Sequence, residues 1–298
     1  MGHIATLFPA ISRRRLPLSR DQLMLLLAAI NLLFLGLDTY LAHLVSGTIV
    51  LRETIPIYFG VIAGVILLLA GLIALRNRRL AVILGSIVFV SSILVGLLGA
   101  YFHIIRASLP HAPIGSRISV SLLIWAPPVI APLTFSLVGL WGMSAALVEE
   151  PAGSGILRIL GKYRIRLPYS KTRAYLMMVS LGILATLLSS VLDHARDEFR
   201  NPWVWVPMIA GVFGTVVPAG LAAIQKPTRM DVTIYIFTML LLIVVGVVGA
   251  VLHVQVDLAS QQVIVVERFI RGAPFLAPLL FANMGMFGLI VLVSPEEG

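Results

Sequence analysis

Long apolar runs separated by short polar segments dominate the pattern of the chain. Eight runs reach about 20 residues, the length that crosses a bilayer as a helix. The apolar residues follow one another without strict alternation, so the pattern predicts helices and not the strands of a barrel. The eight predicted spans cover residues 22–46, 55–75, 80–104, 119–147, 174–195, 203–224, 231–254 and 272–294.

The composition agrees with this pattern. Of the 298 residues, 59% are hydrophobic and 12% are charged, and the mean hydropathy is +1.02. A soluble domain has about 45–50% apolar and about 25% charged residues. The balance excludes a soluble globular enzyme and a disordered chain, and the absence of cysteine excludes a disulfide-rich secreted domain. We therefore expect an all-α integral membrane protein.

The positive charges gather on one side of the predicted membrane. Segment 1–21 and the segments after the second, fourth and sixth spans carry 15 of the 22 Lys and Arg residues. The side richer in these residues is cytoplasmic. The protein is therefore predicted to lie in the cell inner (plasma) membrane with both termini in the cytoplasm. The net charge of +9 then reflects topology and contact with anionic lipid headgroups. No basic stretch is interleaved with aromatic residues, so we expect no nucleic acid as a partner.

The two halves of the chain resemble each other at an offset near 150 residues. Residues 95–103 match 245–253 in register, and 128–133 match 274–279. Each half has four spans, an even number, so both halves enter the membrane from the same side as parallel repeats. The predicted divisions are a basic cytoplasmic N-terminus (1–21), a first four-helix repeat (22–148), a basic cytoplasmic linker (149–173) and a second four-helix repeat (174–298).

Prolines and glycines recur at matching positions of the two repeats. Pro132 and Pro278 lie one turn inside the fourth and eighth spans and are expected to kink them. Glycines one and two turns before a histidine are expected to clear space for a large flat cofactor in each bundle. These glycines are Gly96, Gly99, Gly246 and Gly249.

Four histidines lie near the outer ends of the odd-numbered spans: His43, His103, His194 and His253. An ionisable residue inside a span is by default a candidate functional residue. In each repeat, one histidine from the first helix and one from the third can face a shared cavity. Two opposed imidazoles at one depth suit the axial positions of haem iron. The sequence therefore predicts His43 with His103, and His194 with His253, as haem b ligands.

The same histidines have a structural interpretation. A histidine at a helix C-terminus is favoured by the helix dipole, and duplication copies residues, so four histidines give only two independent observations. A quinone or another metal ion are further alternatives for such a cavity. Sites that need cysteine, among them iron–sulfur clusters, are excluded because the chain has none.

No phosphate loop, HExxH motif or nucleophile elbow occurs in the chain. Whether the protein is an enzyme stays open, and the most that is expected is an electron-transfer subunit of an oxidoreductase complex. The sequence predicts a multi-pass membrane subunit that binds haem b and transfers electrons near the outer face, with other membrane or outer-face subunits as partners. The alternatives are a cofactor-free scaffold or anchor subunit of a larger membrane complex, and a small-molecule carrier.

Overall fold

Six long apolar helices form most of the molecule. The computed structural model describes residues 18–45, 47, 49–74, 76–159, 163–258 and 265–293; most of segment 1–21 and the last five residues lie outside this part. Each of the six is long and apolar enough to cross a membrane, as expected of a multi-pass membrane protein. They are α3 (Arg20–Leu44), α4 (Leu51–Ala74), α5 (Arg78–Arg106), α8 (Lys171–Ala195), α9 (Trp205–Ala223) and α10 (Arg229–Leu258).

The fourth and eighth predicted spans are not single long helices. Residues 119–147 contain α6 (Val120–Trp125) and α7 (Leu133–Ala146), and residues 272–294 contain α12 (Leu279–Val291). The expected kinks at Pro132 and Pro278 are wrong, because α7 and α12 begin directly after these prolines. Proline has no backbone N–H and disfavours a helical residue before it, so it starts a helix more readily than it continues one.

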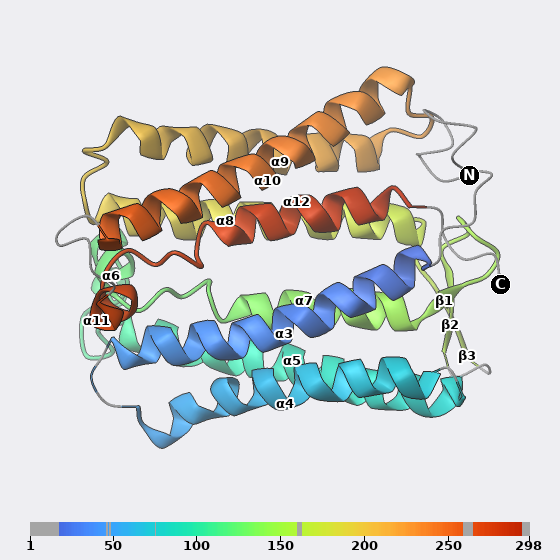
Figure 1. Cartoon of the computed structure of the whole chain (residues 1–298), viewed down its shortest axis with the longest axis horizontal. Coiled ribbons are helices and arrows are strands. Elements are labelled where there is room, and N and C mark those ends of the chain that lie inside the picture. Colours follow the sequence, from blue (N-terminus) through green and yellow to red (C-terminus); the bar gives the residue numbers. More distant parts are fainter. Residues whose placement is uncertain are drawn as a thin grey trace.

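The helices run side by side along the longest axis of the molecule (Figure 1). The short helices α6 and α11 (Val266–Arg271) lie at one end, called here the α6–α11 end, and a small sheet lies at the other, called the sheet end. Two single 3-10 turns, η1 (Ile114–Ser116) and η2 (Pro202–Val204), complete the helical elements of the described residues.

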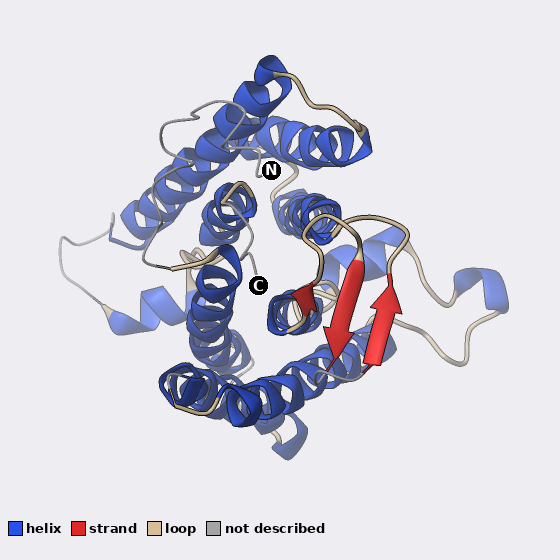
Figure 2. Ribbon diagram, turned by 90° about the vertical axis from the view of Figure 1, so that its right-hand side faces the viewer, coloured by secondary structure: helices blue, strands red, loops and turns tan. Residues whose placement is uncertain are grey.

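The sheet lies in the predicted linker, for which the sequence indicated no structure. Its strands β1 (Val148–Glu149), β2 (Ile156–Ile159) and β3 (Tyr163–Arg166) pair antiparallel in the order β1-β2-β3. Figure 2 shows the strands across the helix ends, with β3 as the outer strand. The linker is therefore an ordered element at the sheet end over the residues that the structure describes.

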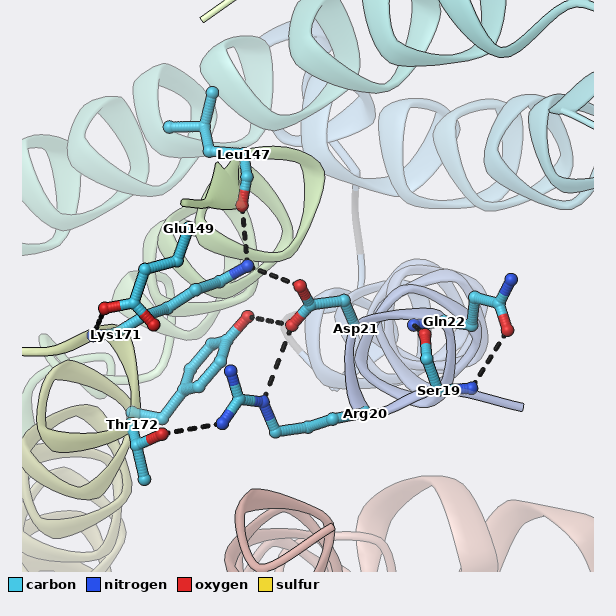
Figure 3. Close-up of polar contacts among 9 residues, drawn as sticks. Ser19, Arg20, Asp21, Gln22, Leu147, Glu149, Lys171 and Thr172 are labelled. Carbon is cyan, nitrogen blue, oxygen red and sulfur yellow. Dashed lines mark hydrogen bonds and ion pairs between the residues drawn. The ribbon is translucent and has the colours of Figure 1, made fainter. Parts of the chain in front are cut away.

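A buried polar cluster at the sheet end joins α3 to α8 (Figure 3). Lys171 Nζ lies 2.5 Å from Asp21 Oδ2 and donates to the Leu147 carbonyl at 2.6 Å. The hydroxyl of Tyr175 donates to Asp21 Oδ1 at 3.1 Å. Glu149 Oε1 accepts from the backbone N–H of Lys171 at 2.9 Å. The beginning of α8 is thus tied to α3, to the end of α7 and to β1.

Candidate functional site: two histidine pairs

The four histidines lie close to the C-terminal ends of the helices that run toward the α6–α11 end. His43 and His194 are the second-last residues of α3 and α8, and His103 and His253 lie one turn further inside α5 and α10. All four sequence-predicted residues are therefore at the same end of the molecule.

The histidines face one another in two pairs of nearly equal geometry. The ring centroids of His43 and His103 are 6.3 Å apart with an interplanar angle of 64°. Those of His194 and His253 are 6.4 Å apart with an angle of 89°. The structure thus brings together the same partners that the sequence pattern paired.

Backbone carbonyls orient three of the four rings through Nδ1. His103 Nδ1 donates to the Pro128 carbonyl at 2.8 Å, and His253 Nδ1 donates to the Pro274 carbonyl at 3.1 Å. His43 Nδ1 donates to the Thr39 carbonyl at 2.7 Å. A carbonyl oxygen only accepts, so the proton is on Nδ1 and the lone pair of the neutral ring is on Nε2. This is the tautomer in which Nε2 can bind a metal.

The carbonyls that His103 and His253 contact belong to the non-helical segments before α7 and α12. Such carbonyls have no intrahelical partner, and an unsatisfied carbonyl is costly in an apolar environment. Each of these two histidines therefore also fixes the entry of a short helix onto the end of a long one.

The second pair lines a cavity of about 790 Å³. Its walls come from α8, α9, α10 and the segment before α12, and most of the lining side chains are apolar. The polar groups beside the two histidines include Asp193, Asp197 and Arg200. The volume lies within the range of about 300–1,000 Å³ that is usual for cofactor and small-molecule sites.

Gly96 and Gly99, the glycines two turns and one turn before His103, do not clear space for a cofactor, which corrects the sequence-based expectation. A Cβ on Gly96 would lie 2.3 Å from Ser136 Oγ, and a Cβ on Gly99 would lie 2.7 Å from Pro132 Cβ. In the other half, a Cβ on Gly246 would lie 2.5 Å from the backbone N of Ala282. These glycines admit the first turns of α7 and α12. Gly249 also contacts Pro278, although it lies on the cavity wall.

The donor set of each pair is limited to two imidazoles. Among the described residues, no group of three or more His, Cys, Asp or Glu side chains could hold a metal ion. A zinc site takes three or four protein ligands, whereas haem iron already has four ring nitrogens and needs only axial ligands. Two facing histidines therefore fit haem better than a bare metal ion.

Two cavity-lining residues, Arg200 and Asn201, were not found by sequence reasoning. They follow a turn in which Glu198 and Phe199 have φ values of 53° and 52°. The ring of Phe199 stacks on Trp205 with centroids 5.3 Å apart, which holds this turn against α9. Left-handed conformations at residues other than Gly, Asn or Asp have no sequence signal, so the wall that this turn forms could not be predicted.

No family model, no curated protein and no solved structure matches the chain. A functional assignment therefore depends on the residues and geometry of the chain itself.

Proposed function

We propose that the chain is a membrane electron-transfer subunit built from two parallel four-helix repeats, each of which holds haem b between its paired histidines. The single observation that carries this proposal is the His194–His253 pair, with ring centroids 6.4 Å apart at a cavity of about 790 Å³. The paragraphs below give the support for the repeats, the crossings and the cofactor in turn.

Equivalent residues of the two halves make equivalent contacts, which supports the duplication. His103 contacts Pro128 as His253 contacts Pro274. Trp141 of α7 and Phe287 of α12 are equivalent at an offset of 146 residues, and their buried rings contact each other. Contact between equivalent residues is expected beside a two-fold axis, so we infer a pseudo-two-fold axis between α7 and α12.

Eight crossings are supported by the course of the two shorter helices. Segment 120–148 leads from α6 at one end of the molecule to β1 at the other (Figure 1). The 14 residues of α7 span about 21 Å, and the non-helical residues before it extend the path. Non-helical backbone at membrane depth must be covered by protein, and the bond from His103 to Pro128 meets part of this requirement.

The separation of the rings supports a bis-histidine cofactor. A metal–imidazole bond is about 2 Å, and the bonding nitrogen lies about 1 Å from the ring centre. If both imidazoles of a pair held one metal ion, their centroids would be about 6 Å apart. The separations of 6.3 Å and 6.4 Å are compatible with this, and they also lie in the range of an ordinary edge contact between rings.

Haem bound here would supply one-electron transfer, and the protein would set its orientation and potential. The Nδ1 bonds to Pro128 and Pro274 fix the ring planes and make Nε2 a stronger donor. Arg200 on the cavity wall pairs with Glu198 at 3.1 Å, and it would exchange this exposed partner for a haem propionate. We propose quinol and an outer-face subunit as the redox partners.

The test is to purify the chain from a haem-supplied host and record the pyridine haemochrome and the reduced-minus-oxidised spectrum. We expect haem b in the wild type, and loss of the second haem in His194→Ala. The control is His111→Ala, since His111 is an exposed turn residue that belongs to neither pair. A wild-type protein without a haem α band and without iron would refute the proposal.

A cofactor-free scaffold is the second candidate, and one observation favours it: His103 and His253 already have a structural role through the carbonyls of Pro128 and Pro274. His253→Asn separates the two candidates, because an amide can donate to the Pro274 carbonyl but is a poor axial ligand. A scaffold predicts no haem α band in the wild type or the variant, and nearly unchanged assembly of the variant. Haem binding predicts that the fold survives while the second haem is lost.

A further inference from the structure

Strands β2 and β3 of the small sheet carry mainly apolar side chains on one face and mainly arginines on the other. Cross-strand partners share a face, and the register pairs Leu157 with Ile165 and Ile159 with Tyr163. On the opposite face, the register pairs Arg158 with Arg164 and Ile156 with Arg166. Strands β2 and β3 therefore carry three arginines and Ile156 on one face and four apolar or aromatic side chains on the other. Strand β1 adds Val148 to the face with the arginines and the buried Glu149 to the other, opposite Leu157.

The apolar face points toward the helices but extends past them. Leu157 is only 6% exposed, so this face packs on the protein at β2. On β3 the same face carries Tyr163 and Ile165, which are 70% and 50% exposed. Figure 2 shows β3 as the outer strand, to the side of the helix ends. Two large side chains on the same face as Leu157 are thus not fully covered by protein.

The sheet lies at the level where helices leave the apolar region. β1 begins two residues after α7 ends, and α8 begins five residues after β3 ends. α8 is one of the helices able to cross a membrane, and its charged first residue is where the apolar run stops. Tyrosine is enriched at this interfacial depth, and an amphipathic element with arginines on its polar face is typical of segments that lie in the interface.

The basic face has a surplus of positive charge. Arg158 and Arg164 lie directly opposite each other, an arrangement of like charges that is unfavourable without counter-charge. Glu150 pairs with Arg158 at 2.5 Å. Within the described residues, Arg164 and Arg166 have no ion-pair partner, and both are exposed. Lipid phosphates are suitable partners for such arginines.

We infer that β3 lies in the headgroup layer of the adjacent leaflet, with Tyr163 and Ile165 in contact with lipid and with Arg164 and Arg166 bound to anionic headgroups. The sheet is then a lipid-docking surface that anchors the linker between the two halves. This inference does not depend on haem binding.

The absence of cysteine in the chain makes a site-directed test direct. Nitroxide labels on Tyr163→Cys and Arg164→Cys are compared in nanodiscs of zwitterionic lipid and of lipid with phosphatidylglycerol. Collision with oxygen reports lipid contact, and collision with a water-soluble nickel chelate reports water. We expect the label at position 163 to collide more often with oxygen and the label at position 164 to collide more often with the nickel chelate. This difference in collision rates should be larger in nanodiscs that contain phosphatidylglycerol.

The double change Arg164→Gln with Arg166→Gln, in the Tyr163→Cys background, should abolish the response to phosphatidylglycerol. The matched control is Arg76→Gln with Arg79→Gln, which removes the same charge from the α4–α5 turn at the same end of the molecule. Circular dichroism confirms that each variant is folded. Equal nickel access at 163 and 164 would overturn the inference. A label at 163 shielded from both probes would also overturn it and would indicate protein at this face.

Discussion

Gly96 and Gly71 show, at the residue scale, that helical glycines in this chain have different roles. A Cβ on Gly96 would lie 2.6 Å from the backbone N of Ser136, whereas a Cβ on Gly71 would meet nothing within 4 Å. Both residues are inside long helices. Only Gly96 is therefore required for close packing, between α5 and α7.

We expect Gly96→Ala to lower stability by about 1–3 kcal/mol, because the added methyl group forces α7 away from α5. Gly71→Ala should be neutral or slightly stabilising, since alanine is the better helix former by about 1 kcal/mol. Thermal unfolding of both variants in one detergent, followed by circular dichroism, measures the difference. Equal unfolding temperatures would show that α5 and α7 do not pack as described.

The ion pair between Asp21 and Lys171 connects two elements, the beginnings of α3 and α8. The two residues are 150 positions apart, close to the offset of the sequence repeat, so equivalent ends of the two halves carry opposite charges. Lys171 is 1% exposed and Asp21 is 15% exposed. Arg20 Nε also lies 3.6 Å from Asp21 Oδ1, and Arg20 is 1% exposed. Removing the Asp21 carboxylate therefore leaves two buried cations uncompensated, whereas removing Lys171 leaves Asp21 paired with Arg20.

Asp21→Asn should therefore destabilise the protein by about 3–5 kcal/mol, and Lys171→Met should cost less because Asp21 keeps Arg20 as a partner. The double variant Asp21→Asn with Lys171→Met also removes the Lys171 charge and should recover part of this loss, while Arg20 stays without its carboxylate partner. Unfolding free energies of the wild type, both single variants and the double variant form the complete cycle. Additive effects of the two single changes would mean that the residues do not interact.

At the element scale, apolar runs were sufficient to predict the six long helices, because length and hydropathy determine a membrane span. The same runs overestimated the lengths of α7 and α12, because these helices begin only after Pro132 and Pro278. The sheet was missed because its strands have only two to four residues. Pairing of the histidines followed from the repeat. Arg200 on the cavity wall did not, because it depends on a turn without a sequence signal.

The wrong prediction that glycines before the histidines clear space for a cofactor has a related cause. Spacing along a helix shows which side chains share a face, but it does not show what packs against that face. Gly99 was expected to face a cofactor, and it faces Pro132 instead. The spacing was sufficient to place Gly99 one turn before His103, but the identity of the group that contacts it required the structure.

For the whole molecule, the number of crossings determines which surfaces share a compartment. The segments around Ser116 and Ser154 flank α6, α7 and β1, so they lie on opposite sides of the membrane only if residues 120–148 cross it. Ser154 and Asn201 serve as the control pair for opposite sides of the membrane. They flank α8, a single helix that is long and apolar enough to span it.

We expect an impermeant maleimide to label Ser116→Cys and Asn201→Cys in intact spheroplasts, and to label Ser154→Cys only after lysis. The expected inside location of Ser154 follows from the surplus of Lys and Arg in its segment. Labelling of Asn201→Cys but not Ser116→Cys would mean that residues 120–148 enter and leave on one side. The two halves would then have opposite orientations, and the pseudo-two-fold arrangement of the two histidine pairs at one membrane face would have to be abandoned.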